Sequence, residues 1–275
     1  NTTRRFIKMS ENLTRASSGV VYIALLIFCT LFSPITFHIL FTVFMCLSIY
    51  EFSKMTNYKY YYLFAIGGIL ISVLFFISQL PPANLIYIAA GCVVFNVLLL
   101  FNLFKDKSFH KYHKTYSHLF LYITLPFILL LSIPNFITPA KYEIVLAIFI
   151  MIWSNDTFAY LVGKSIGKHK LLERVSPKKT IEGFIGGIVF TIIASIIISQ
   201  FYTFFNVTLW IITAIVIALF GTLGDLVESK FKREAGVKDS GNIMPGHGGI
   251  LDRLDSVIFV VPFLYILYLI YFTYA

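Results

Sequence analysis

The sequence predicts an all-α, polytopic integral membrane protein with about nine transmembrane helices and a polar site on the cytoplasmic side of the membrane. Hydrophobic residues make up 58% of the 275 residues and charged residues only 13%, whereas soluble domains carry about 25% charged residues. The apolar residues form runs of about 20, the length that crosses a bilayer as a helix. Most of the remaining charge lies in short segments between these runs. We therefore interpret residues 1–275 as a single membrane-embedded domain.

The apolar runs divide the chain in a regular order. Before the first run, residues 1–17 mix four basic side chains with apolar ones. This pattern suits either a short helix on an anionic membrane surface or a disordered tail. Pro34 separates the first two runs and requires a tight connection between them. We expect membrane spans at about 18–33, 35–51, 60–78, 83–104, 117–133, 143–162, 184–204, 207–226 and 256–274.

The Lys and Arg residues are distributed asymmetrically about these spans. With nine spans, all 22 of them except Lys141 fall in the N-terminal segment or in loops on the same side of the membrane. Cytoplasmic loops carry an excess of Lys and Arg. We therefore expect the charged loops to face the cytoplasm from a plasma (inner) membrane. The net charge of +9 is explained by this topology, and we expect no nucleic-acid partner.

Several common motifs are missing from the sequence. Cys29, Cys46 and Cys92 lie singly inside apolar runs, so they predict neither a disulfide framework nor a zinc site. No cleavage site follows the first apolar run, and we expect no removable signal peptide. The phosphate loop of P-loop enzymes, the G-x-S-x-G nucleophile and the H-E-x-x-H zinc helix are also absent. The polar site must therefore work without these devices.

The stretch 221–256 holds six of the 13 acidic residues, although it lies between two apolar runs. Asp225, Glu228, Ser229 and Lys232 are spaced to share one face of a helix. Asp225 still belongs to the preceding apolar run. Its carboxylate should therefore lie near the end of a membrane helix, where ionisable groups are costly and usually functional.

A glycine-rich segment and a second acidic pair follow. In residues 246–249, successive backbone N–H groups could converge on an anion at the start of a helix. Asp252 and Asp255 then lie one helical turn apart, with Arg253 on another side. Two carboxylate pairs facing an anion-binding backbone fit Mg²⁺ with a nucleoside triphosphate. A solvated loop with helix-capping acids is the alternative for any single residue of this group.

A second polar stretch covers residues 163–183. Asp156 and Tyr160 lie one helical turn apart at the end of the sixth apolar run, just before this stretch, and are expected to be buried near the cytoplasmic end of that run. Ser176 could cap a helix that begins at Pro177 and directs its free N–H groups at an anion.

The basic residues of this stretch have two interpretations. Lys178 and Lys179 follow the expected helix start and would point at the same anion. A basic loop that only obeys membrane topology is the alternative, and it is the interpretation we prefer for Lys170 and Arg174.

Blocks of residues at fixed spacing resemble the signature of the phosphatidate cytidylyltransferase (CDP-diacylglycerol synthase) family. The blocks are Ser229-x-x-Lys232-Arg233, Lys238-Asp239, Pro245-x-His247-Gly248-Gly249 and Asp252-Arg253-x-Asp255. Asp156-x-x-Ala159-Tyr160-x-x-Gly163 and Ser176-Pro177-Lys178-Lys179-Thr180-x-Glu182-Gly183 look like further blocks of this family. The resemblance implies that CTP and phosphatidate give CDP-diacylglycerol and pyrophosphate with Mg²⁺, in phospholipid biosynthesis. It also implies a homodimer and leaves room for a second cation.

The residues and the resemblance together assign roles in this reaction. We expect Mg²⁺ to be held first by Asp225 and Asp252, with Asp255 and Glu228 as further ligands. The expected catalytic residues are Asp225, Asp252, Lys232, Arg233, Lys238 and Arg253. The expected substrate-binding residues are Asp156, Tyr160, Ser176, Lys178, Lys179, Ser229, Asp239, His247, Gly248 and Gly249.

Two other functions compete with this interpretation. A CTP-dependent lipid kinase would transfer the γ-phosphoryl group to a lipid alcohol and would need a free carboxylate as base. An ion-coupled transporter could use Asp156 and Asp225 as an ion pathway. Transporters often contain two similar halves, whereas the polar residues here concentrate in the C-terminal half.

Overall fold

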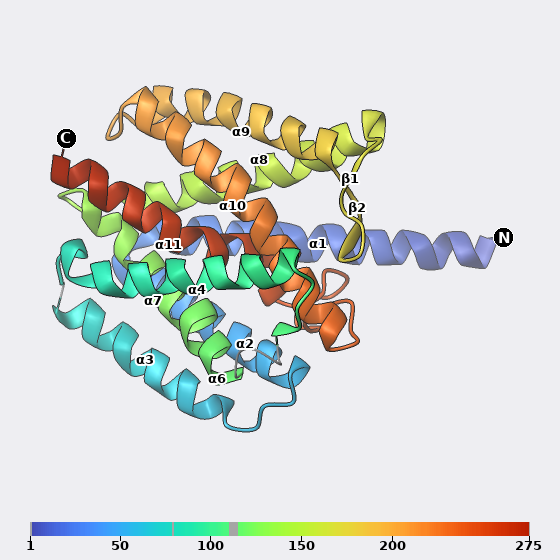
Figure 1. The fold of residues 1–275 in the computed structure, drawn as a ribbon, viewed down its shortest axis with the longest axis horizontal. Helices are drawn as coiled ribbons and strands as arrows, with labels where there is room; N and C mark the ends of the chain where they lie inside the picture. The colour runs from blue at the N-terminus through green and yellow to red at the C-terminus, as the bar shows by residue number, and fades with distance from the viewer. Residues whose placement is uncertain (1, 79, 110–114, 275) are drawn as a thin grey trace.

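The structure, a computed structural model, describes residues 2–78, 80–109 and 115–274 and is built almost entirely of helices (Figure 1). The helices are α1 (Thr2–Phe32), α2 (Pro34–Met55), α3 (Tyr61–Ser78), α4 (Ile86–Phe104), α6 (Thr115–Ser117), α7 (Leu125–Ser132), α8 (Glu143–Ile166), α9 (Ile181–Phe201), α10 (Val207–Glu234) and α11 (Leu251–Tyr274). Two 3₁₀ turns, η1 (Pro82–Leu85) and η3 (Ile133–Phe136), and a π-helical turn, η2 (His118–Thr124), extend α4 and α7. The strands β1 (Lys170–Leu172) and β2 (Ser176–Thr180) form an antiparallel hairpin.

The all-α membrane architecture is confirmed. Among the described residues, eight helical segments are long and apolar enough to cross a membrane, at the positions of the second to ninth predicted spans. The first predicted span falls in the second half of α1, where the apolar segment Ala16–Phe32 is shorter than the others. The count of nine therefore holds only when this shorter segment is included.

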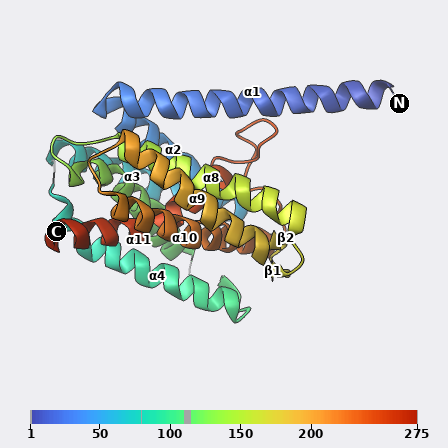
Figure 2. The same cartoon turned by 90° about the horizontal axis from the view of Figure 1, so that it is seen from above.

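Helix α1 differs from the expectation for the N-terminal segment. It runs without a break from Thr2 to Phe32, so residues 2–17 form neither a separate helix nor a tail. Figures 1 and 2 show its N-terminal half extending beyond the rest of the bundle. A position of this half on the membrane surface stays a prediction.

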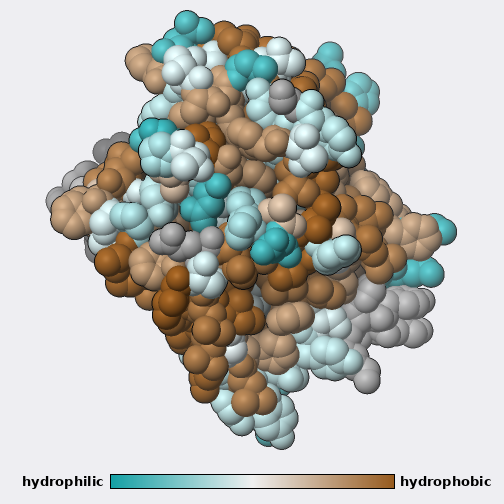
Figure 3. All heavy atoms as spheres, turned by 90° about the vertical axis from the view of Figure 1, so that its left-hand side faces the viewer, coloured by the Kyte–Doolittle hydropathy of each residue, from teal (hydrophilic) through white to brown (hydrophobic). Residues whose placement is uncertain are grey.

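The long helices run back and forth, and the charged connections gather at one end of the bundle. The hairpin, the loop of residues 235–250 and residues 105–109 after α4 all lie toward the side of Figure 1 on which the N-terminus is marked. Figure 3 shows the opposite end, where apolar residues mix with scattered polar ones without a continuous polar surface. Every residue of α7 is buried at the centre, whereas only 17% of the α3 segment is buried. The polar site must therefore form at the charged end.

The hairpin contradicts the expected helix start at Ser176 and Pro177. Both residues belong to β2, and α9 begins only after Thr180, whose side chain accepts a hydrogen bond from the N–H of Gly183 at 3.1 Å. A proline favours an extended residue before it and is itself tolerated at a strand edge. The stretches 163–183 and 225–255 are thus not continuous loops, because each contains the ends of two helices.

Close helix contacts bring the polar ends of α8 to α11 together, and small residues permit them. A Cβ atom on Gly187 of α9 would lie 2.6 Å from Oδ1 of Asn155 on α8. A Cβ atom on Gly224 of α10 would lie 2.5 Å from Cβ of Phe259 on α11. Small residues at membrane helix interfaces let backbones approach in this way.

Gly224→Ala is expected to destabilise the protein, because the new methyl group must push α10 away from the buried Phe259. Overpacking of this kind costs about 1–3 kcal/mol. Gly221→Ala, one turn away on the same helix, is the matched control, since its Cβ atom would lie 3.7 Å from Ser256 and 3.8 Å from Val260. Thermal unfolding in detergent should show a lower melting temperature for Gly224→Ala only. Equal melting temperatures would show that the α10–α11 contact is not tight.

Candidate active site

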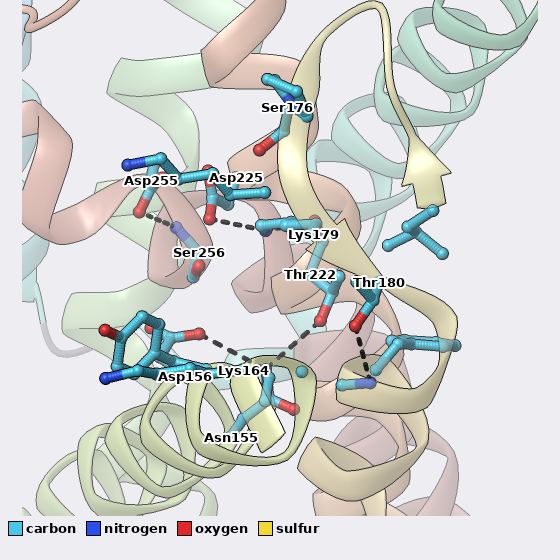
Figure 4. A pocket seen from close by; sticks show the side chains of 18 of the residues that line it. Asn155, Asp156, Lys164, Ser176, Lys179, Thr180, Thr222, Asp225, Asp255 and Ser256 are labelled. Atoms are coloured by element: carbon cyan, nitrogen blue, oxygen red, sulfur yellow. Dashed lines mark hydrogen bonds and ion pairs between the residues drawn. The ribbon is translucent and has the colours of Figure 1, made fainter. Parts of the chain in front are cut away.

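A cleft of about 760 Å³ opens at the charged end of the bundle, between the ends of α8, α9, α10 and α11 and the hairpin (Figure 4). It is the meeting point of both polar stretches of the sequence. The predicted site residues that line it are Asp156, Tyr160, Ser176, Lys178, Lys179, Asp225, Lys232, Asp239, Asp252, Arg253 and Asp255. Lys164 and Lys170 add two further cations to its wall.

Three carboxylates from α10 and α11 crowd together beside this cleft, and two of them, Asp225 and Asp255, line it. Asp225, Glu228 and Asp255 each offer an oxygen atom, and these atoms lie within 4.8 Å of one another. The first two residues share a face of α10, as their spacing predicts. Asp255 comes from the second turn of α11, which packs closely on α10. We call this group the carboxylate trio.

The carboxylate trio has too few hydrogen-bond donors to balance its three negative charges. Glu228 is 1% exposed, and neither of its oxygens has a well-oriented hydrogen-bond donor among the described residues. It forms an ion pair with the Lys232 ammonium group. Buried carboxylates that lack partners are costly, and a divalent cation bound by their oxygens would remove that cost. The trio therefore fits a Mg²⁺ ion.

Lysines from two elements surround the carboxylate trio. Lys179 extends from β2 toward α10, and its Nζ lies 2.6 Å from Oδ2 of Asp225 (Figure 4). The Ser229 hydroxyl donates to Oδ1 of Asp225 at 3.2 Å. Lys232 lies between Glu228 and Asp252, 2.8 Å from Oδ1 of the latter. Each positive charge thus sits beside carboxylates that would otherwise repel one another.

Asp252 is not a member of the trio, although it shares Lys232 with Glu228, and it holds the glycine-rich loop. Its Oδ2 accepts hydrogen bonds from the backbone N–H of Gly249 at 2.7 Å and of Ser240 at 2.9 Å, and its Oδ1 accepts one from Lys232. The N–H of His247 donates to the carbonyl of Met244 at 2.9 Å. The expected anion cradle at residues 246–249 is therefore wrong for these two N–H groups, because the protein itself uses them.

Several predicted site residues lie outside the cleft lining. Arg233 is exposed and donates to a backbone carbonyl four residues later, at 3.1 Å. Lys238 is also exposed. Nδ1 of His247 lies 2.8 Å from the hydroxyl of Ser18 on α1, where Figure 2 shows the loop between α10 and α11 reaching toward α1. Gly248 has a φ of +85°, the left-handed region that favours glycine.

Asp156 and Tyr160 do line the cleft, but the expectation of burial is wrong. Tyr160 is 64% exposed, and Asp156 is exposed as well. Both sit one turn apart on α8. The neighbouring Asn155 donates to Oδ1 of Asp156 at 3.4 Å and to the hydroxyl of Thr222 at 3.3 Å (Figure 4). Asn155 thus ties α8 to α10 at the floor of the cleft, a role that its place in an apolar run does not reveal.

Glu51, a residue not predicted from the sequence, lies in α2 and is 1% exposed. Its Oε2 accepts a hydrogen bond from the N–H of Leu251, the first residue of α11, at 2.8 Å. The first N–H groups of a helix have no partner within the helix, and a carboxylate at that end is favourable. Glu51 thus caps α11 from another helix. Its position at the end of an apolar run could have marked Glu51 as a functional residue. Nothing in the sequence, however, indicates that its partner is Leu251.

Comparison with known proteins finds a family match over most of the chain. The family model described as "Cytidylyltransferase family" matches residues 13–271. Proteins named phosphatidate cytidylyltransferase are similar to the chain over 125 residues: 54% identical in Staphylococcus haemolyticus (strain JCSC1435) and 55% in Staphylococcus aureus (strain COL). Each match covers 45% of this chain and 48% of the relative. The chain is therefore matched to about half the length of these curated relatives.

Proposed function

We propose, because this chain belongs to the cytidylyltransferase family, that it transfers the cytidylyl group of CTP to phosphatidate and releases pyrophosphate. The observation that carries the proposal is the carboxylate trio, which meets lysines of two elements in one cleft at the end of membrane helices. A water-soluble nucleotide and a lipid headgroup can both reach such a place. The product would be CDP-diacylglycerol.

The reaction needs positioning and charge neutralisation more than proton transfer. A phosphate oxygen of phosphatidate forms a bond to the α-phosphorus of CTP, while the bond from that phosphorus to the pyrophosphate oxygen breaks. The attacking oxygen is already anionic at neutral pH, so no strong base is required. Lys178, Lys179 and Arg253 line the cleft and would hold the phosphates in line and balance their charge.

The carboxylate trio would hold Mg²⁺, which when bound supplies positive charge to the triphosphate. The oxygens of Glu228 support this assignment, because they have an ion-pair partner in Lys232 but no well-oriented hydrogen-bond donor among the described residues. Asp252 was expected to be a first ligand. Its hydrogen bonds to the glycine-rich loop and to Lys232 favour a positioning role instead. A second cation and a homodimer stay predictions.

Isotope labelling separates this reaction from its alternatives. The purified protein is incubated in detergent with Mg²⁺, phosphatidate and CTP labelled at either the α- or the γ-phosphorus. We expect α-label in the lipid fraction and γ-label in pyrophosphate. Label from the γ position in a lipid, with diacylglycerol as acceptor, would identify a lipid kinase. If neither label reaches lipid, while the protein in vesicles moves an ion, the transporter alternative would replace the proposal.

The cleft is proposed to face the cytoplasm, because the Lys and Arg residues gather at its end of the bundle. In a variant without the native cysteines, Ser165→Cys near the cleft should resist a membrane-impermeant thiol reagent added to intact cells. Ala140→Cys, exposed in the connection before α8 at the opposite end, is the matched control and should react. The reverse pattern of labelling would invert the orientation.

A further inference from the structure

The β1–β2 hairpin forms one wall of the cleft and is fixed at two places. At its base, the N–H of Ile181 donates to the carbonyl of His169 at 2.9 Å. Glu182 accepts the N–H of Lys168 at 3.0 Å and contacts Nδ1 of His169 at 2.6 Å. Lys178 and Lys179 lie on β2, between this base and the turn. Where the turn is held therefore determines where the two lysines lie.

The turn of the hairpin is attached to the end of α4 through Arg174. One guanidinium nitrogen, Nη2, donates to the carbonyl of Leu103 at 2.5 Å and to that of Phe104 at 2.9 Å. The last carbonyls of a helix have no partner within the helix, and a cation at that end is favourable. The other terminal nitrogen, Nη1, lies 3.6 Å from Oδ2 of Asp106. Arg174 thus does more than satisfy membrane topology.

The same helix end is also held by α10, the helix that carries Asp225 and Glu228. Nζ of Lys230 donates to the carbonyl of Asn102 at 3.3 Å and lies 3.6 Å from Oδ1 of Asp106. Asp106 therefore contacts one cation from the hairpin and one from α10. We call Arg174, Asp106, Lys230 and the carbonyls of residues 102–104 the clasp. The clasp connects the hairpin turn to the helix that bears two members of the carboxylate trio.

We propose that Arg174 is a positioning residue of the nucleotide site. By fastening the hairpin turn to α4 and α10, it holds Lys179 beside Asp225 and Lys178 at the cleft wall, ready for the phosphates of CTP. A hairpin released at its turn would have to be ordered again whenever the nucleotide binds, which weakens affinity. This inference rests on the proposed function for the identity of its ligand.

Two measurements on Arg174→Ala test the proposal. Hydrogen exchange of residues 170–180 reports whether the turn is fastened, independently of any activity. Binding of CTP with Mg²⁺ in the absence of phosphatidate reports the effect on the site. We expect faster exchange throughout the hairpin and about tenfold weaker CTP binding, as the loss of a charged hydrogen bond predicts. Turnover at saturating CTP should fall less than the affinity does.

Matched variants distinguish the loss of a positioning contact from a general loss of folding. Arg174→Lys keeps the positive charge but not the planar guanidinium group. Compared with Arg174→Ala, it should restore part of the slow hairpin exchange and part of the CTP affinity. Lys168→Ala removes a charge from an exposed side chain at the hairpin base and should behave like the unchanged protein. If Arg174→Ala does not fold, Asp106→Asn weakens the same clasp at an exposed position and should show a smaller shift of the same kind.

Three outcomes would overturn the proposal. Unchanged hairpin exchange in Arg174→Ala would show that the clasp does not order the turn. Faster exchange with unchanged CTP affinity would show that the turn does not position the lysines. If the unchanged protein binds no CTP, the proposed function fails and the role of the lysines with it, while hairpin exchange still tests the clasp itself.

Discussion

Asp225→Asn should lower the rate of CDP-diacylglycerol formation about a thousandfold while the protein stays folded. The carboxylate belongs to the trio and lies 2.6 Å from the ammonium group of Lys179, so its loss disturbs both the cation site and the lysine. Such charge stabilisation is worth several kcal/mol, and each 1.36 kcal/mol changes a rate tenfold. Steady-state kinetics in detergent, with thermal unfolding to verify folding, measure this effect.

Two further variants test the same prediction. Asp255→Asn should be as damaging as Asp225→Asn, because both carboxylates belong to the trio. Glu173→Gln makes the same change of charge at an exposed position in the hairpin turn and should leave the rate unchanged. If Asp225→Asn retained most of the activity at ordinary Mg²⁺, Asp225 would have no part in the reaction centre.

Glu51→Ala should produce the largest loss of stability, because it leaves the N–H of Leu251 without its acceptor in a buried place. A hydrogen bond to a charged group contributes about 1.5–3 kcal/mol, and an unsatisfied buried donor costs about 1–3 kcal/mol. The first turns of α11 carry Asp252 and Asp255, so activity should fall as well. Thermal unfolding in detergent and turnover of the fraction that stays folded give the two readouts.

Glu51→Gln serves as the matched variant, since its amide oxygen can still accept the hydrogen bond from Leu251. It should lose only part of the stability, through the missing charge at the start of α11. Equal stability of Glu51→Ala and the unchanged protein would show that α2 does not cap α11.

Features that depend on local sequence were predictable. The apolar runs locate the membrane helices because length and hydropathy alone decide whether a helix can span a bilayer. Asp225 and Glu228 share a face because α10 continues unbroken through both. The spacing of Asp252 and Asp255 placed both in the site, and the family resemblance added the second polar stretch to it.

Features that depend on distant partners were not predictable. Ser176 was expected to cap a helix, but the pairing of β2 with β1 makes it a strand residue, and Thr180 caps α9 instead. Gly249 looks available to an anion until Asp252 is seen to accept its N–H. Glu51 meets Leu251 across 200 positions of the chain. In each case the deciding interaction lies outside the window that a local pattern can describe.

The proposed cation site is tested most directly by titrating the purified protein with Mn²⁺ in place of Mg²⁺ and measuring free Mn²⁺ by electron paramagnetic resonance. Asp225→Asn, Glu228→Gln and Asp255→Asn are each expected to weaken Mn²⁺ binding at least about tenfold, while Glu173→Gln binds it like the unchanged protein. Equal Mn²⁺ affinity in all of these proteins would contradict the assignment of the carboxylate trio as the metal centre.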